Sequence, residues 1–312
     1  MKKVKIPTLR TCLQAKKSEI ITYLEKICTK KGDKFWYKKS KVNNAVTLVC
    51  HVDTSIKDVE QVWNYKDNKY ENVSIRKRVF FDRQYQVFTG PDGLGGDDRA
   101  GVFGILRVYA SLPAELKPNL LFCDEEETGG HGARDAARLL PELKDSLMMI
   151  ELDRRGVKDC VFYNSEPKEF VDYIESFGFK KDIGSFSDVS TLGSAFNICS
   201  TNLSVGFFNE HTRHETLYCK PLNATIEKTI KIVENATKAG KQWVLPKVET
   251  KKYTYDDDLD RGGYWGRRGR RCQNALPFGG RTRKYTEEEL SRYPYLKELQ
   301  EWEREGFQVY NH

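Results

Sequence analysis

Short apolar runs with many β-branched residues recur along the first two thirds of the chain. Such runs predict strands that are covered on both faces, and they lie at residues 46–50, 119–123, 147–151, 160–163 and 203–207. Apolar residues spaced about 3.6 positions apart predict helices around these runs, at residues 11–29, 100–111, 133–140, 166–177 and 225–239. Strands that alternate with helices predict an α/β protein of three layers, α/β/α, around a mostly parallel, mixed central sheet.

Two parts of the chain depart from this alternation. Residues 78–88 predict a small antiparallel hairpin, which precedes a glycine-rich turn at 89–96. After about residue 248 aliphatic residues become scarce, and residues 256–271 are rich in Gly and Arg, which is typical of a flexible or partner-ordered segment. A capping pattern that starts at Thr286 predicts a terminal helix. We therefore expect one folded domain over residues 1–248 and a Gly/Arg-rich tail with a terminal helix over residues 249–312.

The composition is that of a soluble globular protein. The 312 residues are 39% hydrophobic and 31% charged, and no run approaches the ~20 apolar residues that a membrane span needs. The basic N-terminus turns polar before the apolar core of an export signal can form, so we expect no membrane partner and a cytoplasmic location. The eight cysteines form no closely spaced pair, which predicts reduced thiols.

The net charge of +7 is unevenly distributed, because basic residues outnumber acidic ones in residues 1–42 and 261–284. The usual meaning of such charge runs is a solvated surface. The alternative is a contact with a polyanion such as nucleic acid. Tyr264 and Trp265 lie among the arginines of the tail, so any such contact is expected to be weak and to involve the tail.

Acidic residues and histidines follow the ends of several predicted strands. In folds of this class functional groups gather at the carboxyl ends of the strands, and a partly buried carboxylate needs a partner. Imidazole and carboxylate together are the ligands of zinc and of hydrolytic two-metal sites. Each motif alone is weak evidence for a metal site, but the motifs at all five strand ends together predict one. The acidic residues and histidines at these five strand ends are His51 and Asp53, Asp97 and Asp98, residues 124–127, Glu151 and Asp153, and Glu210, His211, His214 and Glu215.

The order of these motifs resembles that of a known superfamily. The motifs are His-x-Asp-Thr from 51, Gly-Asp-Asp-Arg-Ala-Gly from 96, Glu-Glu-x-Gly-x-x-Gly-Ala from 126, Glu-Leu-Asp-Arg from 151 and His-x-x-x-Glu from 211. Between residues 51 and 215 they resemble the co-catalytic zinc exopeptidases, which include tripeptidase T-like and glutamyl aminopeptidase-like metallopeptidases. The resemblance implies a zinc peptidase-like catalytic domain that hydrolyses peptide bonds, as an aminopeptidase of small peptides.

The resemblance also implies a role for each candidate residue. It implies two Zn²⁺ ions, or other divalent metals such as Co²⁺ or Mn²⁺, with His51 and Asp153 on one ion. Glu127 and His211 would hold the other ion, and Asp97 would bridge the two. Asp53 would orient the imidazole of His51. Glu126 would be the general base, because in the family the base directly precedes the metal-binding Glu.

Neighbouring polar residues have more ordinary interpretations. His131 is expected to start a helix, and Asp98 to cap one. His214 could reach a substrate but is not expected to be a ligand. Asp188 is either an ordinary turn acid or the counterpart of a Gly-Thr-Asp segment that lies beside the site in the family.

The sequence departs from the family in its lack of a large insertion. Only 57 residues separate Asp153 from His211, and only 45 separate His51 from Asp97. We therefore expect a minimal catalytic domain in which a hairpin is the only addition to the core fold. The expected substrates are small peptides with a free N-terminus. An oligomer is possible. Two other functions remain open, a small-molecule amide deacylase on the same site and a non-catalytic nucleic-acid or assembly factor with a vestigial site.

Overall fold

A computed structural model describes residues 6–56, 59–74 and 76–246 of the chain. All of these residues belong to the first of two compact units, Met1–Lys247. The Gly/Arg-rich segment and the terminal helix of the expected tail lie outside the described residues. Within the described part, no helix is both long and apolar enough to cross a membrane, and the seven cysteines found there are free thiols.

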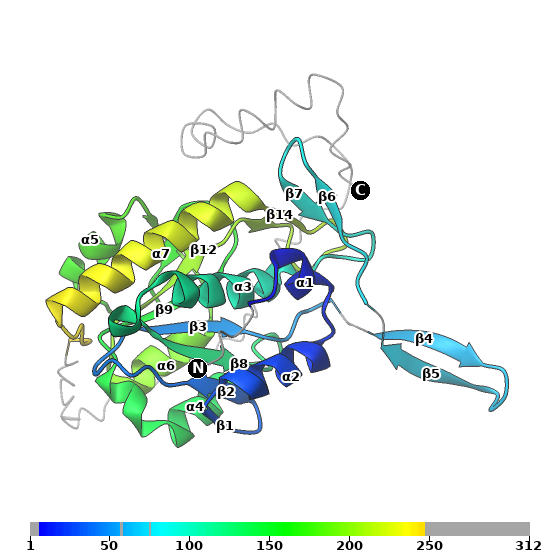
Figure 1. The fold of residues 1–312 in the computed structure, drawn as a ribbon, viewed down its shortest axis with the longest axis horizontal. Helices are drawn as coiled ribbons and strands as arrows, with labels where there is room; N and C mark the ends of the chain where they lie inside the picture. The colour runs from blue at the N-terminus through cyan, green and yellow to red at the C-terminus, as the bar shows by residue number, and fades with distance from the viewer. Residues whose placement is uncertain (1–5, 57–58, 75, 247–312) are drawn as a thin grey trace, which may run out of the picture. The chain divides into compact units, whose positions relative to one another are not determined.

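An eight-stranded mixed sheet forms the centre of the fold (Figure 1). Its four middle strands β8, β3, β9 and β12 are mutually parallel, whereas β2 and β10 run antiparallel to their neighbours β8 and β12. All five expected strands are found, so the predicted mostly parallel sheet is confirmed. In spatial order the strands are β1 (Lys30–Lys31), β2 (Phe35–Lys38), β8 (Asn119–Cys123), β3 (Thr47–His51), β9 (Met149–Arg154), β12 (Ser200–Ser204), β10 (Asp159–Val161) and β11 (Lys180–Asp182).

Helices cover both faces of this sheet, as the three-layer prediction requires. On one face α3 packs against α1 and α7, and on the other α4 packs against α6 (Figure 1). Neighbouring residues of β3 alternate between the two layers, because Leu48 and Cys50 join the core under α3 while Val49 joins the core under α4. The helices are α1 (Leu9–Gln14), α2 (Lys17–Ile27), α3 (Gly96–Ser111), α4 (His131–Leu139), α5 (Lys168–Glu175), α6 (Asp188–Phe196) and α7 (Cys219–Ala239), with short 3₁₀ turns at Ala114–Leu116 and Pro141–Asp145.

The expected helix over residues 11–29 is instead two helices, α1 and α2. Ala15 and Lys16 between them have extended backbone angles. The Glu19 carboxylate accepts a hydrogen bond from the backbone N–H of Lys16 at 3.0 Å, which satisfies a donor at the start of α2. The apolar spacing runs through both helices and therefore does not reveal this break.

The hairpin expected at residues 78–88 is confirmed as β6 (Phe80–Asp82) and β7 (Val87–Thr89). It belongs to a second sheet, in which β7 pairs with β14 (Thr216–Tyr218) and β14 with β13 (Phe207–Phe208). This sheet carries the chain segment between β13 and β14, which contains His211.

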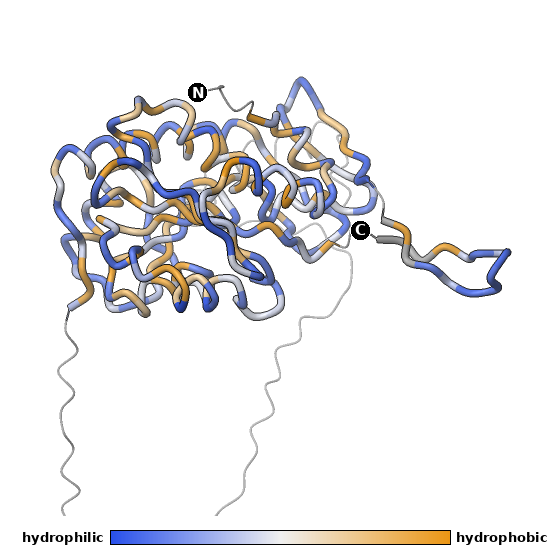
Figure 2. Tube along the Cα trace, turned by 60° about the horizontal axis from the view of Figure 1, so that its bottom comes forward, coloured by the Kyte–Doolittle hydropathy of each residue, from blue (hydrophilic) through white to orange (hydrophobic). Residues whose placement is uncertain are grey.

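The expectation that this hairpin is the only addition to the core fold is wrong. A second hairpin, β4 (Val59–Asn64) and β5 (Lys69–Ser74), forms a two-stranded sheet of its own. The tip of this hairpin is hydrophilic (Figure 2), whereas every residue of the central strands β3 and β8 is buried. Polar residues interrupt the apolar positions of both strands, so the pattern that identifies buried strands is missing here.

Candidate metal centre

The expected ligands converge at one edge of the central sheet. His51 is the last residue of β3, and Asp153 lies near the end of the adjacent parallel strand β9. Asp97 starts α3, Glu127 follows β8, and His211 lies between β13 and β14. The parallel strands bring the first two residues together, and the three loops surround them, as expected for the carboxyl edge of such a sheet.

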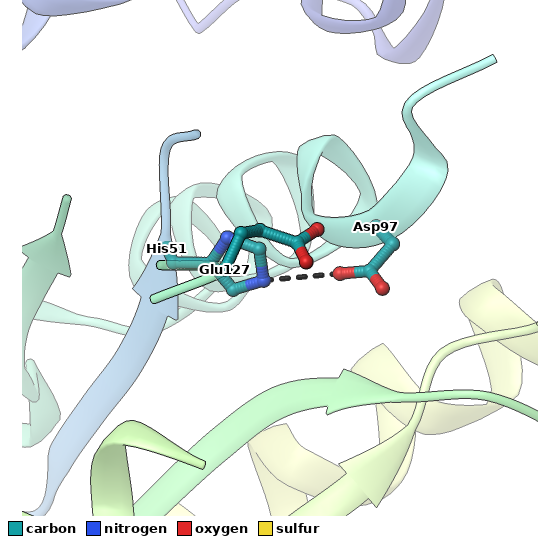
Figure 3. Close-up of side chains that lie close together, drawn as sticks. All are labelled: His51, Asp97 and Glu127. Atoms are coloured by element: carbon teal, nitrogen blue, oxygen red, sulfur yellow. Dashed lines mark hydrogen bonds and ion pairs between the residues drawn. The ribbon is translucent and has the colours of Figure 1, made fainter. Parts of the chain in front are cut away.

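The carboxylate of Asp97 lies at the centre of this group. Its Oδ1 is 3.0 Å from Nε2 of His51, and that same nitrogen is 3.2 Å from Oδ1 of Asp153. The other oxygen of Asp97, Oδ2, is 3.0 Å from Nε2 of His211, which in turn is 3.1 Å from Oε2 of Glu127. Figure 3 shows the side chains of His51, Asp97 and Glu127 gathered at one place, with the contact between the first two dashed. Asp97 therefore faces one His–carboxylate pair with each of its oxygens.

The described residues contain two groups whose donor atoms are close enough to share one metal ion. One group is His51, Asp97 and Glu127, and the other is His51, Asp98 and Asp153. His51, Asp97, Glu127 and Asp153 could thus hold a metal, as the motifs indicate. Asp98 also has the capping contact that is expected of it, because its Oδ1 accepts a hydrogen bond from the backbone N–H of Gly101 at 2.7 Å.

The pKa shifts of the carboxylates show that the fold concentrates negative charge at this site. Burial and, next, the neighbouring Asp97 carboxylate raise the pKa of Asp153 to about 7. Burial also raises the pKa of Glu127, again assisted by Asp97. Burial acts on Asp97 in the same direction, but hydrogen bonds with His211 and His51 outweigh it and hold the pKa of Asp97 below its ordinary value. A divalent cation would relieve this repulsion, so the donor set fits a metal centre.

The two imidazoles respond to the same carboxylates. The hydrogen bond to Asp97 raises the pKa of His211 to about 9. For His51, burial disfavours the charged ring, but Asp153 and two further carboxylates raise its pKa well above the ordinary value.

Asp53 links the two sides of the candidate centre. Nδ1 of His51 lies 3.1 Å from the backbone carbonyl of Asp53 and 3.4 Å from its carboxylate. The same carboxylate accepts hydrogen bonds from the backbone N–H groups of Glu126 and Glu127, both at 3.3 Å. Asp53 therefore contacts the ring that it was expected to orient, and it also holds the loop with the expected base.

A cleft of about 400 Å³ is lined by Glu126 and by every candidate ligand except His51. Burial, together with the Asp153 and Asp97 carboxylates, raises the pKa of Glu126 to about 8. The other lining residues are Gly129, Arg154, Arg155, Tyr163, Ser185, Phe186, Asn202, Phe207 and Glu210.

Glu215 supports Asp97, a role that sequence reasoning missed. It is 1% exposed, and its carboxylate accepts hydrogen bonds from the backbone N–H groups of Gly95 at 2.6 Å and Asp97 at 2.9 Å. The turn that carries Asp97 is thus tied to the end of the His211 segment. The motif that starts at His211 ends at this residue, which is the only sequence signal for it.

Asn202 supports Asp153 in a similar way. Its side-chain oxygen accepts a hydrogen bond from the backbone N–H of Asp153 at 3.0 Å, and its amide nitrogen lies 3.3 Å from Oδ2 of the same residue. Asn202 is 2% exposed on β12. A buried polar residue in an interior strand is a weak signal that could have found it.

The remaining neighbours of the motifs lie at the edge of the site. His131 starts α4, as expected. His214 is exposed and does not line the cleft. Asp188 is fully buried at the start of α6, and burial raises its pKa to about 7.

Comparisons of the sequence with protein-family models and with curated proteins find no match. Solved structures do match. The aminopeptidase PepT from Bacillus cereus has a TM-score of 0.53 at 14% identity, over 73% of this chain and 96% of that protein. A TET aminopeptidase from a Thaumarchaeota archaeon has a TM-score of 0.51 at 12% identity, over 74% of this chain and 97% of that protein.

The TET1 peptidase of Pyrococcus horikoshii also matches, with a TM-score of 0.50 at 15% identity over 72% of this chain and 98% of that protein. That protein can assemble into a tetrahedron or a large octahedral shell. At such identities the likeness concerns the fold, and it confirms at this level the resemblance that the motifs indicate. The chain therefore shares its fold with the aminopeptidase PepT and with the TET aminopeptidases.

Proposed function

We propose that this protein is a metal-dependent hydrolase of peptide bonds, and that it acts as an aminopeptidase on small peptides. The observation that carries the proposal is the position of Asp97, whose two oxygens each face a pair of one histidine and one carboxylate. Two-metal hydrolases use a bridging group of this kind between ions about 3.5–4 Å apart. The peptidase names of the structural neighbours support the same activity.

His51 and Asp153 would hold one divalent ion and Glu127 and His211 the other, with Asp97 shared between them. We propose zinc, with cobalt and manganese as the other ions that this donor set suits. When bound, such ions supply Lewis acidity toward the scissile carbonyl and toward water.

Glu126 is the residue that we assign to proton transfer. It lines the same cleft as Asp97 and Asp153, and the contact of its backbone N–H with Asp53 fixes its loop. In this role the carboxylate accepts a proton from the attacking water and donates it to the leaving amine. The carboxylate of Asp53 contacts both His51 and this loop, so it orients groups and is not itself a reactant.

The deciding experiment combines metal analysis with a peptide panel. The purified full chain, loaded with zinc, should retain two ions per chain and cleave di- and tripeptides with a free N-terminus. Retention of at most one ion at saturating zinc would contradict the two-metal form. Faster hydrolysis of N-acetylated peptides than of free ones would favour the deacylase.

The quaternary structure and the tail are separate parts of the proposal. The shells formed by the Pyrococcus TET1 peptidase suggest that this chain also self-associates, and light scattering at several concentrations would measure this.

We further propose that the basic segment 261–284 makes only a weak contact with polyanions, which should weaken steeply with salt.

A further inference from the structure

Residues 183–187 form one wall of the cleft. This segment, here called the wall loop, connects β11 to α6. Two of its residues, Ser185 and Phe186, line the cleft together with Glu126 and Glu127.

Contacts at several points along its length hold the wall loop. Nη2 of Arg154 donates a hydrogen bond to the backbone oxygen of Ile183 at 3.2 Å. At the other end, the hydroxyl of the fully buried Ser187 donates a hydrogen bond to the carboxylate of Glu151. These two bonds attach both ends of the loop to β9.

Close packing holds the residues between these ends. A Cβ atom on Gly184 would lie 3.1 Å from Cε1 of Tyr163, and one on Gly130 would lie 2.5 Å from Cζ of Phe186. Gly130 is thus the small residue that accommodates the Phe186 ring beside the Glu126–Glu127 loop. Because the wall is held in place before a substrate binds, it loses little conformational freedom on binding.

The wall loop presents the aromatic ring of Phe186 to the cleft beside the polar Ser185, and it carries a second exposed apolar side chain, Ile183. Phe186 is 41% exposed, and Ile183 is 87% exposed. Phe186 lines the cleft together with Tyr163 and Phe207. An exposed aromatic ring on the wall of a cleft is a surface that an apolar ligand group would cover.

The cationic residues of the cleft wall are already paired. The guanidinium of Arg154 lies 3.0 Å from the carboxylate of Asp182, and that of Arg155 lies 2.9 Å from the carboxylate of Glu210. Because each guanidinium already has a carboxylate partner, an acidic substrate side chain would gain less from these arginines than from unpaired ones, whereas an apolar side chain does not depend on them. The balance of charges therefore favours an apolar group against Phe186.

We propose that Phe186 determines specificity and selects peptides whose N-terminal residue has a large apolar side chain. This inference rests on the proposed aminopeptidase function, because an aminopeptidase places the N-terminal residue beside the scissile bond in every turnover. The ring of Phe186 covers that side chain, and the contacts of the wall loop hold the ring in place.

The test compares kcat/KM for Leu-Gly-Gly, Phe-Gly-Gly, Ala-Gly-Gly and Glu-Gly-Gly with the zinc-loaded full chain. The wild type should prefer the Leu and Phe peptides over the Ala peptide by about tenfold or more. Phe186→Ala should lower the Leu-to-Ala ratio by about tenfold with unchanged zinc content, and Phe186→Leu should restore most of it. Ile183→Ala is the matched control, since this exposed side chain of the same loop does not line the cleft, and it should leave the ratio unchanged.

Two results would overturn the proposal while the aminopeptidase function stands. One is a wild type that cleaves Glu-Gly-Gly best, and the other is a Leu-to-Ala ratio that Phe186→Ala does not change. A wild type that cleaves none of the four peptides would instead refute the proposed function, and this inference with it.

Discussion

The two halves of the candidate centre differ in how the fold supports them. His51 and Asp153 come from adjacent parallel strands, and their side chains are 1% and 10% exposed. Glu127 and His211 come from loops, and their side chains are 12% and 53% exposed, so the difference in exposure comes from His211. The first half is positioned by the packing of the central sheet, whereas the second depends on a few loop contacts. The half on the strands should therefore be rigid without metal, and the half on the loops should depend on the metal for its order.

The contacts of the loop half are local. His211 and Asn209 both have positive φ angles, near 60°, a conformation that costs free energy in residues other than glycine. The Thr212 hydroxyl donates a hydrogen bond to the backbone oxygen of Asn209 at 2.7 Å, and the ion pair between Arg155 and Glu210 ties the segment to the end of β9. Few buried groups hold His211, so substitutions here should change metal binding more than stability.

The largest effect is expected for Asp97→Ala, because Asp97 faces both halves. The substitution should remove both metal ions and lower kcat/KM by roughly 10³-fold or more. Metal analysis together with a peptide assay measures both effects. Asp135→Ala is the control, since Asp135 lies on α4 and pairs only with Arg138 among the contacts described. A variant without Asp97 that keeps two ions would show that the halves are independent.

Glu126→Gln should separate proton transfer from metal binding. The amide keeps the shape of the side chain but cannot accept a proton, so we expect kcat to fall by about 10²–10⁴-fold while both ions stay bound. Glu127→Gln, one residue later, should instead weaken one ion. Near-normal activity of Glu126→Gln would mean that Glu125 or another group is the base.

The comparison of the halves is sharpened by His51→Ala and His211→Ala. Each should cost one ion, but their effects on the metal-free protein should differ. Loss of buried His51 leaves Asp153 without a histidine partner and leaves Asp97 with His211 alone, and we expect the free energy of unfolding to fall by about 3 kcal/mol. Loss of His211 should change it by less than about 1 kcal/mol. Denaturant titration of the two metal-free variants measures the difference, and equal destabilisation would contradict the division into a strand half and a loop half.

Most of the central sheet could be predicted from the sequence, and so could the convergence of the candidate ligands, because both leave local signals. Strands such as β3 and β8 are continuous apolar runs, and the candidate ligands follow strand ends in recognisable motifs. The roles of Glu215 and Asn202 could not be predicted. Glu215 binds backbone N–H groups 118 and 120 residues away, and no local pattern encodes such partners. The hairpin β4–β5 was missed because its strands lack a buried apolar run.

Glu215→Gln tests whether zinc binding depends on the hydrogen bonds by which Glu215 positions Asp97. The amide can accept one of the two backbone N–H groups through its oxygen, but its NH₂ group then opposes the other donor. Asp97 should lose its exact orientation, and zinc affinity should fall by about 10–100-fold. Competition with a chelator measures this. Thr229→Val is the control, because Thr229 is equally buried but its hydroxyl bonds only within α7. Unchanged zinc affinity in Glu215→Gln would mean that Asp97 is held by the metal ions alone.

The smallest effect is expected for removal of the tail, provided that the cut spares the segment that packs on the central fold. Trp243 contacts the rings of Phe170 and Tyr173, and its backbone exchanges hydrogen bonds with Leu147 and Cys199. Leu245 adds a hydrogen bond to Asn197. A chain that ends at Pro246 keeps all of these contacts.

We therefore expect this truncated chain to keep its folded state, both metal ions and peptide hydrolysis within about twofold of the full chain. A chain that ends at Gly240 loses the aromatic contacts of the half-buried Trp243 and should be destabilised by about 3 kcal/mol. Thermal unfolding and metal analysis of both truncations measure these effects. If the chain that ends at Pro246 is insoluble or metal-free, the tail belongs to the catalytic fold and the expected boundary near residue 248 is wrong.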